Sequence, residues 1–265
     1  MVNLNIMEGT QPRTPGTALV PEQLMAVIGA TKRVAATGDP EVLAVGTLTE
    51  VDNAEQDAIF GTVSDGTLPQ ALEAIRDVFP NARVVAIRCD ADGAAAPTVT
   101  AIQAVGLVSS VLAMFGRRVT ILTTAEKTWN ENAMGDVDNA ESNDLVSAME
   151  NMCESINCIG VVSAPDTTIA EALAWQKVNT ANRLLGADYV VIPPGEVDEI
   201  LGAPYWAAGL YKNNIQNGYW RNPHNTQVPG IGTVKPALSA QIRVPSAESQ
   251  QIVCLLYTSP SPRDS

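Results

Sequence analysis

Short apolar runs alternate with helical repeats through the middle of the chain. Runs such as Leu24–Ala30, residues 118–122 and residues 158–162 have the length of buried strands. Between the first two of these runs, apolar side chains at positions 68, 72, 75 and 79 recur at the spacing of one helix face. Apolar strands that alternate with helices are typical of parallel strands covered on both faces. The pattern therefore predicts an α/β protein built on a parallel sheet.

The same pattern gives the expected elements and two helix starts. Strands are predicted at 24–30, 42–45, 82–87, 118–122, 158–162 and 189–192, and helices at 51–60, 68–79, 101–115, 142–155 and 168–185. Thr67 is expected to cap the second helix, with Pro69 in its first turn. Thr168 and Glu171 have the spacing of a capping box, in which each side chain bonds to the backbone amide of the other residue.

Two segments fall outside this rhythm. Residues 1–22 are polar and rich in turn residues, and they are expected to form an extended arm. Residues 202–236 are rich in Gly, Pro, Asn and aromatic residues, which predicts an elaborate ordered loop. Its expected anchors are four aromatic side chains, Trp206, Tyr211, Tyr219 and Trp220.

Charge and polarity exclude several classes of protein. The formal net charge is −13, and basic residues cluster only in pairs such as Lys32-Arg33 and Arg117-Arg118, which argues against direct nucleic-acid binding. The N-terminus carries no pattern of a secretory signal, so the protein is expected in a cytoplasm. The uncharged stretch Ala94–Gly116 is interrupted by polar residues, which favours a buried helix over a membrane span.

Metal ligands are sparse and badly spaced. The cysteines at 89, 153, 158 and 254 form no CxxC pair, and His224 is the single histidine, so a zinc site is not expected and reduced, buried thiols are preferred. The acidic run Glu131, Asp136, Asp138 and Glu141 lacks the spacing of a calcium loop, and solvated carboxylates explain it better. The sequence thus predicts no metal and no cofactor.

One enzymatic interpretation remains open. Ser163 and Asp166 follow the strand predicted at 158–162, at the sheet edge where α/β proteins often bind ligands, although a helix cap explains Asp166 at least as well. A Ser–His–Asp triad would have only His224 as its base, without a nucleophile turn. Gly230 and Gly232 lack the third glycine of a dinucleotide motif, and a turn is the preferred interpretation.

An ordered series of small and aromatic residues then carries a resemblance to a known family. Ala208-Gly209-Leu210 is followed by Gly218-Tyr219-Trp220, Asn222-Pro223-His224-Asn225 and Gly230-Ile231-Gly232. This series resembles the AGL…GxW…PxN…GxxG run that follows the α/β domain of contractile tail sheath proteins. The resemblance covers roughly residues 10–245 and includes Thr14-Pro15-Gly16, Val27-Ile28-Gly29 and Gly66-Thr67-Leu68. Lys212-Asn213-Asn214 and Tyr189-Val190-Val191 depart from the family pattern and leave the subfamily open.

The resemblance implies a domain plan and a set of motif residues. It implies an N-terminal arm at 1–22, a smaller α+β domain at 23–97, a subtilisin-like α/β sheath domain at 98–233 and the start of a C-terminal domain at 234–253. It assigns a structural and interaction role to Gly218, Trp220, Pro223, Asn225, Gly230 and Gly232. It implies no catalytic residue.

The family also implies a function and partners. A sheath subunit is a structural protein of a virion tail, assembled in the host cytoplasm, which surrounds the tail tube and contracts to drive it through the target envelope. Its partners would be other copies of itself in rings, the tube protein, the baseplate and the tail terminator, with neither nucleic acid nor membrane. A sheath of a bacteriocin-like or secretion-type injection machine, and a small α/β enzyme with a sheet-edge site, are the alternatives.

The last residues are expected not to be native. Residues 254–264, CLLYTSPSPRD, resemble a translated sequencing-library adaptor, so residues 254–265 are left out of the fold prediction. The reading frame is then expected to be cut near Val253, before the C-terminal region of sheath relatives. We predict that the chain as it stands is monomeric or aggregates, because a sheet edge normally covered by that region would be exposed.

Overall fold

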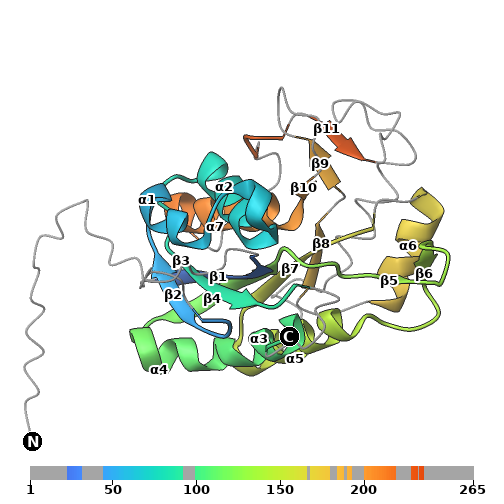
Figure 1. Cartoon of the computed structure of the whole chain (residues 1–265), viewed down its shortest axis with the longest axis horizontal. Coiled ribbons are helices and arrows are strands. Elements are labelled where there is room, and N and C mark those ends of the chain that lie inside the picture. Colours follow the sequence, from blue (N-terminus) through green and yellow to red (C-terminus); the bar gives the residue numbers. More distant parts are fainter. Residues whose placement is uncertain are drawn as a thin grey trace, which may run out of the picture.

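A six-stranded, mostly parallel sheet forms the centre of the protein (Figure 1). The computed structural model describes residues 23–31, 44–91, 99–165, 168–179, 184–187, 190–192, 200–218, 228–231 and 233–235. The strands are β1 (Gln23–Ala30), β2 (Leu48–Val51), β3 (Val84–Cys89), β4 (Arg118–Thr124), β7 (Ile159–Ser163) and β8 (Leu184–Ala187), in the spatial order β2-β3-β1-β4-β7-β8. Only β2, at one edge, pairs antiparallel. The predicted α/β fold class is confirmed.

Helices cover both faces of this sheet. One layer consists of α2 (Thr67–Val78) and α7 (Ala203–Asn217), and the other of α5 (Asp144–Ile156) and the segment α3 (Ala101–Leu107), η3 (Val108–Ser110) and α4 (Val111–Phe115). Successive side chains of β1 point into opposite layers, since Met25 and Val27 pack with the first layer while Leu24, Ala26 and Ile28 pack with the second. Burial on both faces explains why this strand is a continuous apolar run.

The smaller elements surround this core. The short helices α1 (Ala54–Asp57), η1 (Ala58–Phe60) and η2 (Val63–Asp65) lie between β2 and α2 in the chain. The strands β5 (Asn130–Glu131) and β6 (Val137–Asp138) form a hairpin, and α6 (Ile169–Val178) follows β7. A separate antiparallel sheet joins β9 (Val190–Ile192) to β10 (Ile200–Leu201) and β11 (Thr233–Lys235).

Several element boundaries differ from the prediction. Val45 lies in a turn instead of a strand. The helix predicted at 51–60 is shorter and has two parts: Val51 ends β2, and the helical residues that follow belong to α1 and η1. The predicted helix at 168–185 ends at Val178, and Leu184 and Leu185 belong to β8. A short apolar run fits a helix or a strand equally well, and here parallel pairing with β7 decides between them. The strand β9 joins the small antiparallel sheet instead of continuing the central one.

The loop predicted at 202–236 is wrong over its first half, because residues 203–217 form α7. Pro204 lies in the first turn, where its missing N–H leaves no helical hydrogen bond unmade. Tyr205, Ala208 and Tyr211 are buried at helical spacing against α2 and the sheet. Tyr211 thus acts as an anchor, and its hydroxyl donates to the carbonyl oxygen of Gln23 at 2.8 Å, whereas Trp206 is 41% exposed.

The central sheet continues across the boundary expected between residues 97 and 98. Strand β1 pairs with β3 on one side and with β4 on the other, so strands from both expected domains join in one sheet, with β2, β3 and β1 in one half and β4, β7 and β8 in the other. Parallel pairing, which links residues far apart in the chain, sets this order and leaves no local sequence signal. Residues 1–22, 236–253 and 254–265 lie outside the described residues, while Val234 and Lys235 belong to β11.

Candidate functional site

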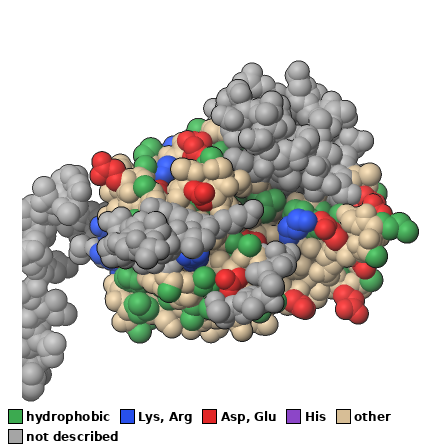
Figure 2. All heavy atoms as spheres, in the orientation of Figure 1, with side chains coloured by type: hydrophobic (Ala, Val, Ile, Leu, Met, Phe, Trp, Pro, Cys, Tyr) green, Lys and Arg blue, Asp and Glu red, His purple; other side chains and the backbone are tan. Residues whose placement is uncertain are grey.

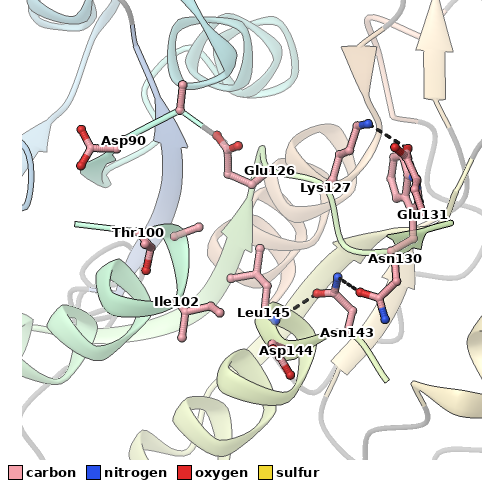
Figure 3. Close-up of a pocket in the computed structure, with 13 residues that line it drawn as sticks. Asp90, Thr100, Ile102, Glu126, Lys127, Asn130, Glu131, Asn143, Asp144 and Leu145 are labelled. Atoms are coloured by element: carbon pink, nitrogen blue, oxygen red, sulfur yellow. Dashed lines mark hydrogen bonds and ion pairs between the residues drawn. The ribbon is translucent and has the colours of Figure 1, made fainter. Parts of the chain in front are cut away.

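A pocket of about 550 Å³ opens at the carboxyl edge of the central sheet (Figure 3). The ends of β3 and β4 supply one wall, and the first turns of α3 and α5 supply the other. Its lining includes acidic, amide and apolar side chains, among them Asp90, Thr100, Ile102, Glu126, Lys127, Trp129, Glu131, Asn143, Asp144 and Leu145. This edge is where open α/β sheets place their ligand sites.

Glu126 has a structural role at the back of the pocket. Its carboxylate accepts from the backbone N–H of Ala30 at 2.8 Å and from the hydroxyl of Thr67 at 2.5 Å. Thr67 is the first residue of α2 and Gly66 takes the cap position, so the predicted Thr67 cap is wrong. The Glu126 side chain therefore joins the ends of β1 and β4 to the start of α2, and the residue is only 9% exposed.

The outer rim of the pocket carries an ion pair. Lys127 Nζ lies 2.8 Å from a carboxylate oxygen of Glu131 and 5.9 Å from the centre of the Trp129 ring. The hydrogen bond from Lys127 holds the pKa of Glu131 below its usual value. Both side chains of the pair are well exposed, so solvent screening leaves them little effect on stability.

The described lining of the pocket supplies neither the nucleophile nor the base of a hydrolytic triad. Among its described lining residues there is no serine, cysteine or histidine. Ser163, the proposed sheet-edge nucleophile, is fully buried, and its hydroxyl accepts from the backbone N–H of Ala203 at 3.0 Å. Its carbonyl oxygen accepts from the Thr128 hydroxyl. Asp166 and His224 lie outside the described residues. Ser163 thus stabilises the start of α7 and is closed to a substrate.

The candidate metal ligands do not converge. Glu131, Asp136, Asp138 and Glu141 are exposed on or beside the β5–β6 hairpin. In the described part of the chain no group of three or more His, Cys, Asp or Glu side chains is arranged to hold a metal ion. Cys89, Cys153 and Cys158 are buried free thiols, as predicted, and burial raises the pKa of the Cys89 thiol.

The described residues of the sheath-like motif make close packing contacts. A Cβ added to Gly209 on α7 would lie 2.9 Å from a methyl carbon of Val228, and one added to Gly230 would lie 2.8 Å from the Tyr205 ring. Gly230 has φ +85° and lies in a turn, which confirms the turn interpretation. Gly218 ends α7 with φ +88°.

These contacts place residues 228–231 against α7. Val228 lies over Gly209 of the AGL portion, and Gly230 of the GxG portion lies over Tyr205. The motif residues Trp220, Pro223, Asn225 and Gly232 lie outside the described residues, and their interaction role stays a prediction.

The uncharged stretch around residues 101–115 is buried on one side only. Ala104, Val105, Val108 and Val111 pack into the core, whereas Ile102, Leu112 and Met114 are 44%, 50% and 59% exposed. Within the described residues, no helix has the length and apolarity to cross a bilayer. The prediction of a buried helix therefore holds for the inner face alone.

Sequence reasoning missed Glu126 and Trp129, which help to form the pocket. Both follow β4 closely, at the carboxyl end of a predicted strand, and that position was the available signal. The pocket wall formed by α3 and α5 had no such signal, because it depends on the order of strands in the sheet.

Comparison with known proteins identifies the fold. No protein-family model and no curated protein sequence matches the chain. The structure is similar to a chain of the PVC sheath complex, an extracellular contractile injection system studied by cryo-EM in its contracted state, with a TM-score of 0.53 and 12% identity. The match covers 86% of this chain and 53% of that one, so this chain spans about half the length of that sheath protein. At this identity the likeness establishes a shared fold.

Proposed function

We propose that this chain is a structural subunit of a contractile sheath. The observation that carries the proposal is the fold shared with a sheath-complex chain over 86% of the residues. The ordered motif at 208–232 supports it independently, because a resemblance in sequence and a likeness in structure point to the same family. The closed environment of Ser163 weighs against the sheet-edge enzyme.

The proposed mechanism uses the α/β core as a rigid body. A sheet packed on both faces resists internal deformation, so movement is confined to the contacts between copies. Copies would stack in rings around a tube, and contraction would be a rigid-body rearrangement between two arrangements of those contacts, without a catalytic residue. The partners in this proposal are other copies, the tube protein, the baseplate and the terminator.

The machine to which the sheath belongs has two candidates. The sequence motif fits either a phage tail, with the subunit in a virion, or an injection machine, and the similar structure comes from an extracellular contractile injection system. Neighbouring genes distinguish them: capsid and DNA-packaging genes beside this reading frame would favour the phage tail, and their absence from a complete cluster would favour the injection machine.

Negative-stain electron microscopy tests the sheath proposal. The reading frame continued from the source DNA would be expressed with and without the tube protein encoded beside it. Striated tubes, or sheath-like tubes without the inner protein, are the expected result. A dispersed monomer under both conditions, with a melting temperature that shifts on adding a small-molecule ligand, would favour the enzyme instead.

A further inference from the structure

Two exposed surfaces of different character lie apart on the molecule, one over α4 and the other at the tip of the β5–β6 hairpin. The segment α3–η3–α4 runs to the lower left of Figure 1, and the β5–β6 hairpin lies at the right. Figure 2 shows apolar side chains over α4 and acidic side chains at the right-hand end. Because α4 and the hairpin lie on opposite sides of Figure 1, a contact between them joins two copies and not two parts of one chain.

The first surface is the outer side of residues 101–115, called here the neutral helical face. Residues 93–116 contain no Asp, Glu, Lys or Arg, in a chain with 17% charged residues. Ile102, Gly106, Ser109 and Ala113 are exposed at intervals of four, three and four residues, the spacing of one helix side. A solvent-facing helix usually carries charged residues on its outer side, so this face has the composition of a covered surface.

Gly106 strengthens this interpretation of the neutral helical face. A Cβ at this position would meet no atom within 4 Å, so the fold itself does not require a glycine there. Glycine lowers helix stability relative to alanine, and its missing side chain would let another chain approach the backbone closely. The exposed Leu112 and Met114 lie on the same segment and add apolar area.

The second surface is the hairpin of residues 130–138, called here the acidic hairpin. Met134 at its tip is 89% exposed, and Asp136 and Asp138 are exposed beside it. The tip is held in shape by Asn132, whose side-chain oxygen accepts from the backbone N–H groups of Met134 and Asp136 at 2.8 and 3.0 Å. The acidic hairpin thus presents a large apolar side chain to solvent on an ordered turn, where a neighbouring copy could cover it.

We propose that the acidic hairpin of one copy docks on the neutral helical face of the next copy, with Met134 against the apolar side chains and the carboxylates towards Arg118. Arg118 is exposed at the start of β4, directly after this segment. The inference rests on the proposed function and names a contact between its copies.

Charge is the argument for a second copy as the occupant. With a net charge of −13, copies repel one another at long range. The neutral helical face offers an acidic hairpin a surface without charges of its own and, after its last residue, the cation Arg118. A contact between two different surfaces repeats from copy to copy, so it builds a ring or a helical array, as a sheath needs.

Disulfide trapping tests the contact. Met134→Cys would be combined in turn with Leu112→Cys and Met114→Cys in the same protein that is expressed for microscopy, with Cys254, where that protein contains it, replaced by Ser. The native thiols at 89, 153 and 158 are buried, so they are not expected to form disulfides between copies. Mild oxidation should give a ladder of dimers, trimers and longer species from at least one double variant, while a mixture of the corresponding single variants should stop at dimers. Met134→Cys with Val63→Cys is the matched control, because Val63 is exposed elsewhere, at 41%.

A charge exchange provides a second test. Arg118→Glu alone, and Asp136→Arg with Asp138→Arg, should each weaken self-association at least about tenfold, because like charges would then face each other. Mixing these two variants should restore association, since each copy meets an opposite charge on its neighbour. Sedimentation velocity measures both effects.

The outcomes separate this inference from the sheath proposal. Tubes that form normally from the charge variants, with no ladder from any hairpin pair, would overturn the docking contact and leave the sheath proposal standing. Cross-links equal to those of the Val63 control, or cross-links to the tube protein in place of a ladder, would also overturn it. If the wild-type protein gives neither tubes nor self-association, both proposals fail.

Discussion

The backbone nitrogen of Ala203 lies 3.0 Å from the hydroxyl oxygen of Ser163, so the first residue of α7 is bonded to the last residue of β7. The two residues are separated by 40 positions in the chain. The bond gives a partner to one of the amides that a helix start leaves without an intrahelical acceptor. A residue that the sequence offers as a nucleophile is therefore a hydrogen-bond acceptor for the start of a helix.

Replacing Ser163 by alanine tests that role. Ser163→Ala should lower the free energy of unfolding by about 1–2 kcal/mol, because the buried Ala203 amide loses its acceptor. Urea denaturation measures the change. Ser110→Ala is the control, since Ser110 is exposed, and it should stay within about 0.5 kcal/mol of the wild type. A Ser163→Ala protein as stable as the wild type would contradict the assigned role.

Two glycines should respond in opposite directions to alanine. Gly230→Ala combines a φ of +85° with a Cβ 2.8 Å from the Tyr205 ring, and should cost about 1–3 kcal/mol of stability. Gly106→Ala fills open space in a helix and should add about 0.5–1 kcal/mol. Thermal and urea unfolding of the two variants side by side measure this. A Gly230→Ala protein as stable as the wild type would show that the packing around residues 228–231 is not as described.

Arg76 should be the most costly charged residue to remove. It is 8% exposed and its guanidinium donates to Asp57 through two nitrogens, at 2.6 and 3.0 Å, and to three backbone carbonyl oxygens. Arg76→Ala should lower stability by about 3–5 kcal/mol, because the carboxylate and the carbonyls lose their partner. Denaturant titration gives the value.

Lys127 provides the matched comparison, because its partner Glu131 is solvent-exposed. Lys127→Ala should cost at most about 1 kcal/mol. Adding Asp57→Ala to Arg76→Ala should have less effect than Asp57→Ala alone, because the pair is already broken. Additive losses would argue against the pairing of Arg76 with Asp57.

The free energy of unfolding should decrease at alkaline pH because two buried tyrosines lose their protons more readily in the unfolded chain. Burial raises the pKa of Tyr205 and of Tyr211 from about 10 to about 12. The unfolded chain releases these protons first, so the free energy of unfolding decreases as pH rises from about 10 to about 12 and is unaffected below that window. Denaturant titrations across this range measure the loss, and tyrosinate absorbance should appear with unfolding. In Tyr211→Phe the decrease should be smaller, and an unchanged decrease would contradict the burial of this hydroxyl.

The sequence alone determined the fold class and most of the central elements. Strands such as β1 and β7 are buried on both faces. Such burial requires a run of consecutive apolar residues, and this run can be recognised in the sequence without knowledge of the fold. The capping box predicted at Thr168 and Glu171 is present at the start of α6, because both partners lie within one helical turn. A hydrogen bond or packing contact between residues close in the chain can therefore be predicted from a short stretch of sequence.

The tertiary structure decided what depends on distant partners. Strand β1 lies between β3 and β4, Leu184 and Leu185 pair with β7 instead of extending a helix, and α7 forms where composition predicted a loop. The hydrogen bond between Ser163 and Ala203 and the sheet-edge pocket likewise need residues from several elements. In each case the local sequence permits more than one backbone state, and the free energy that selects one comes from burial and hydrogen bonds formed only when remote segments meet.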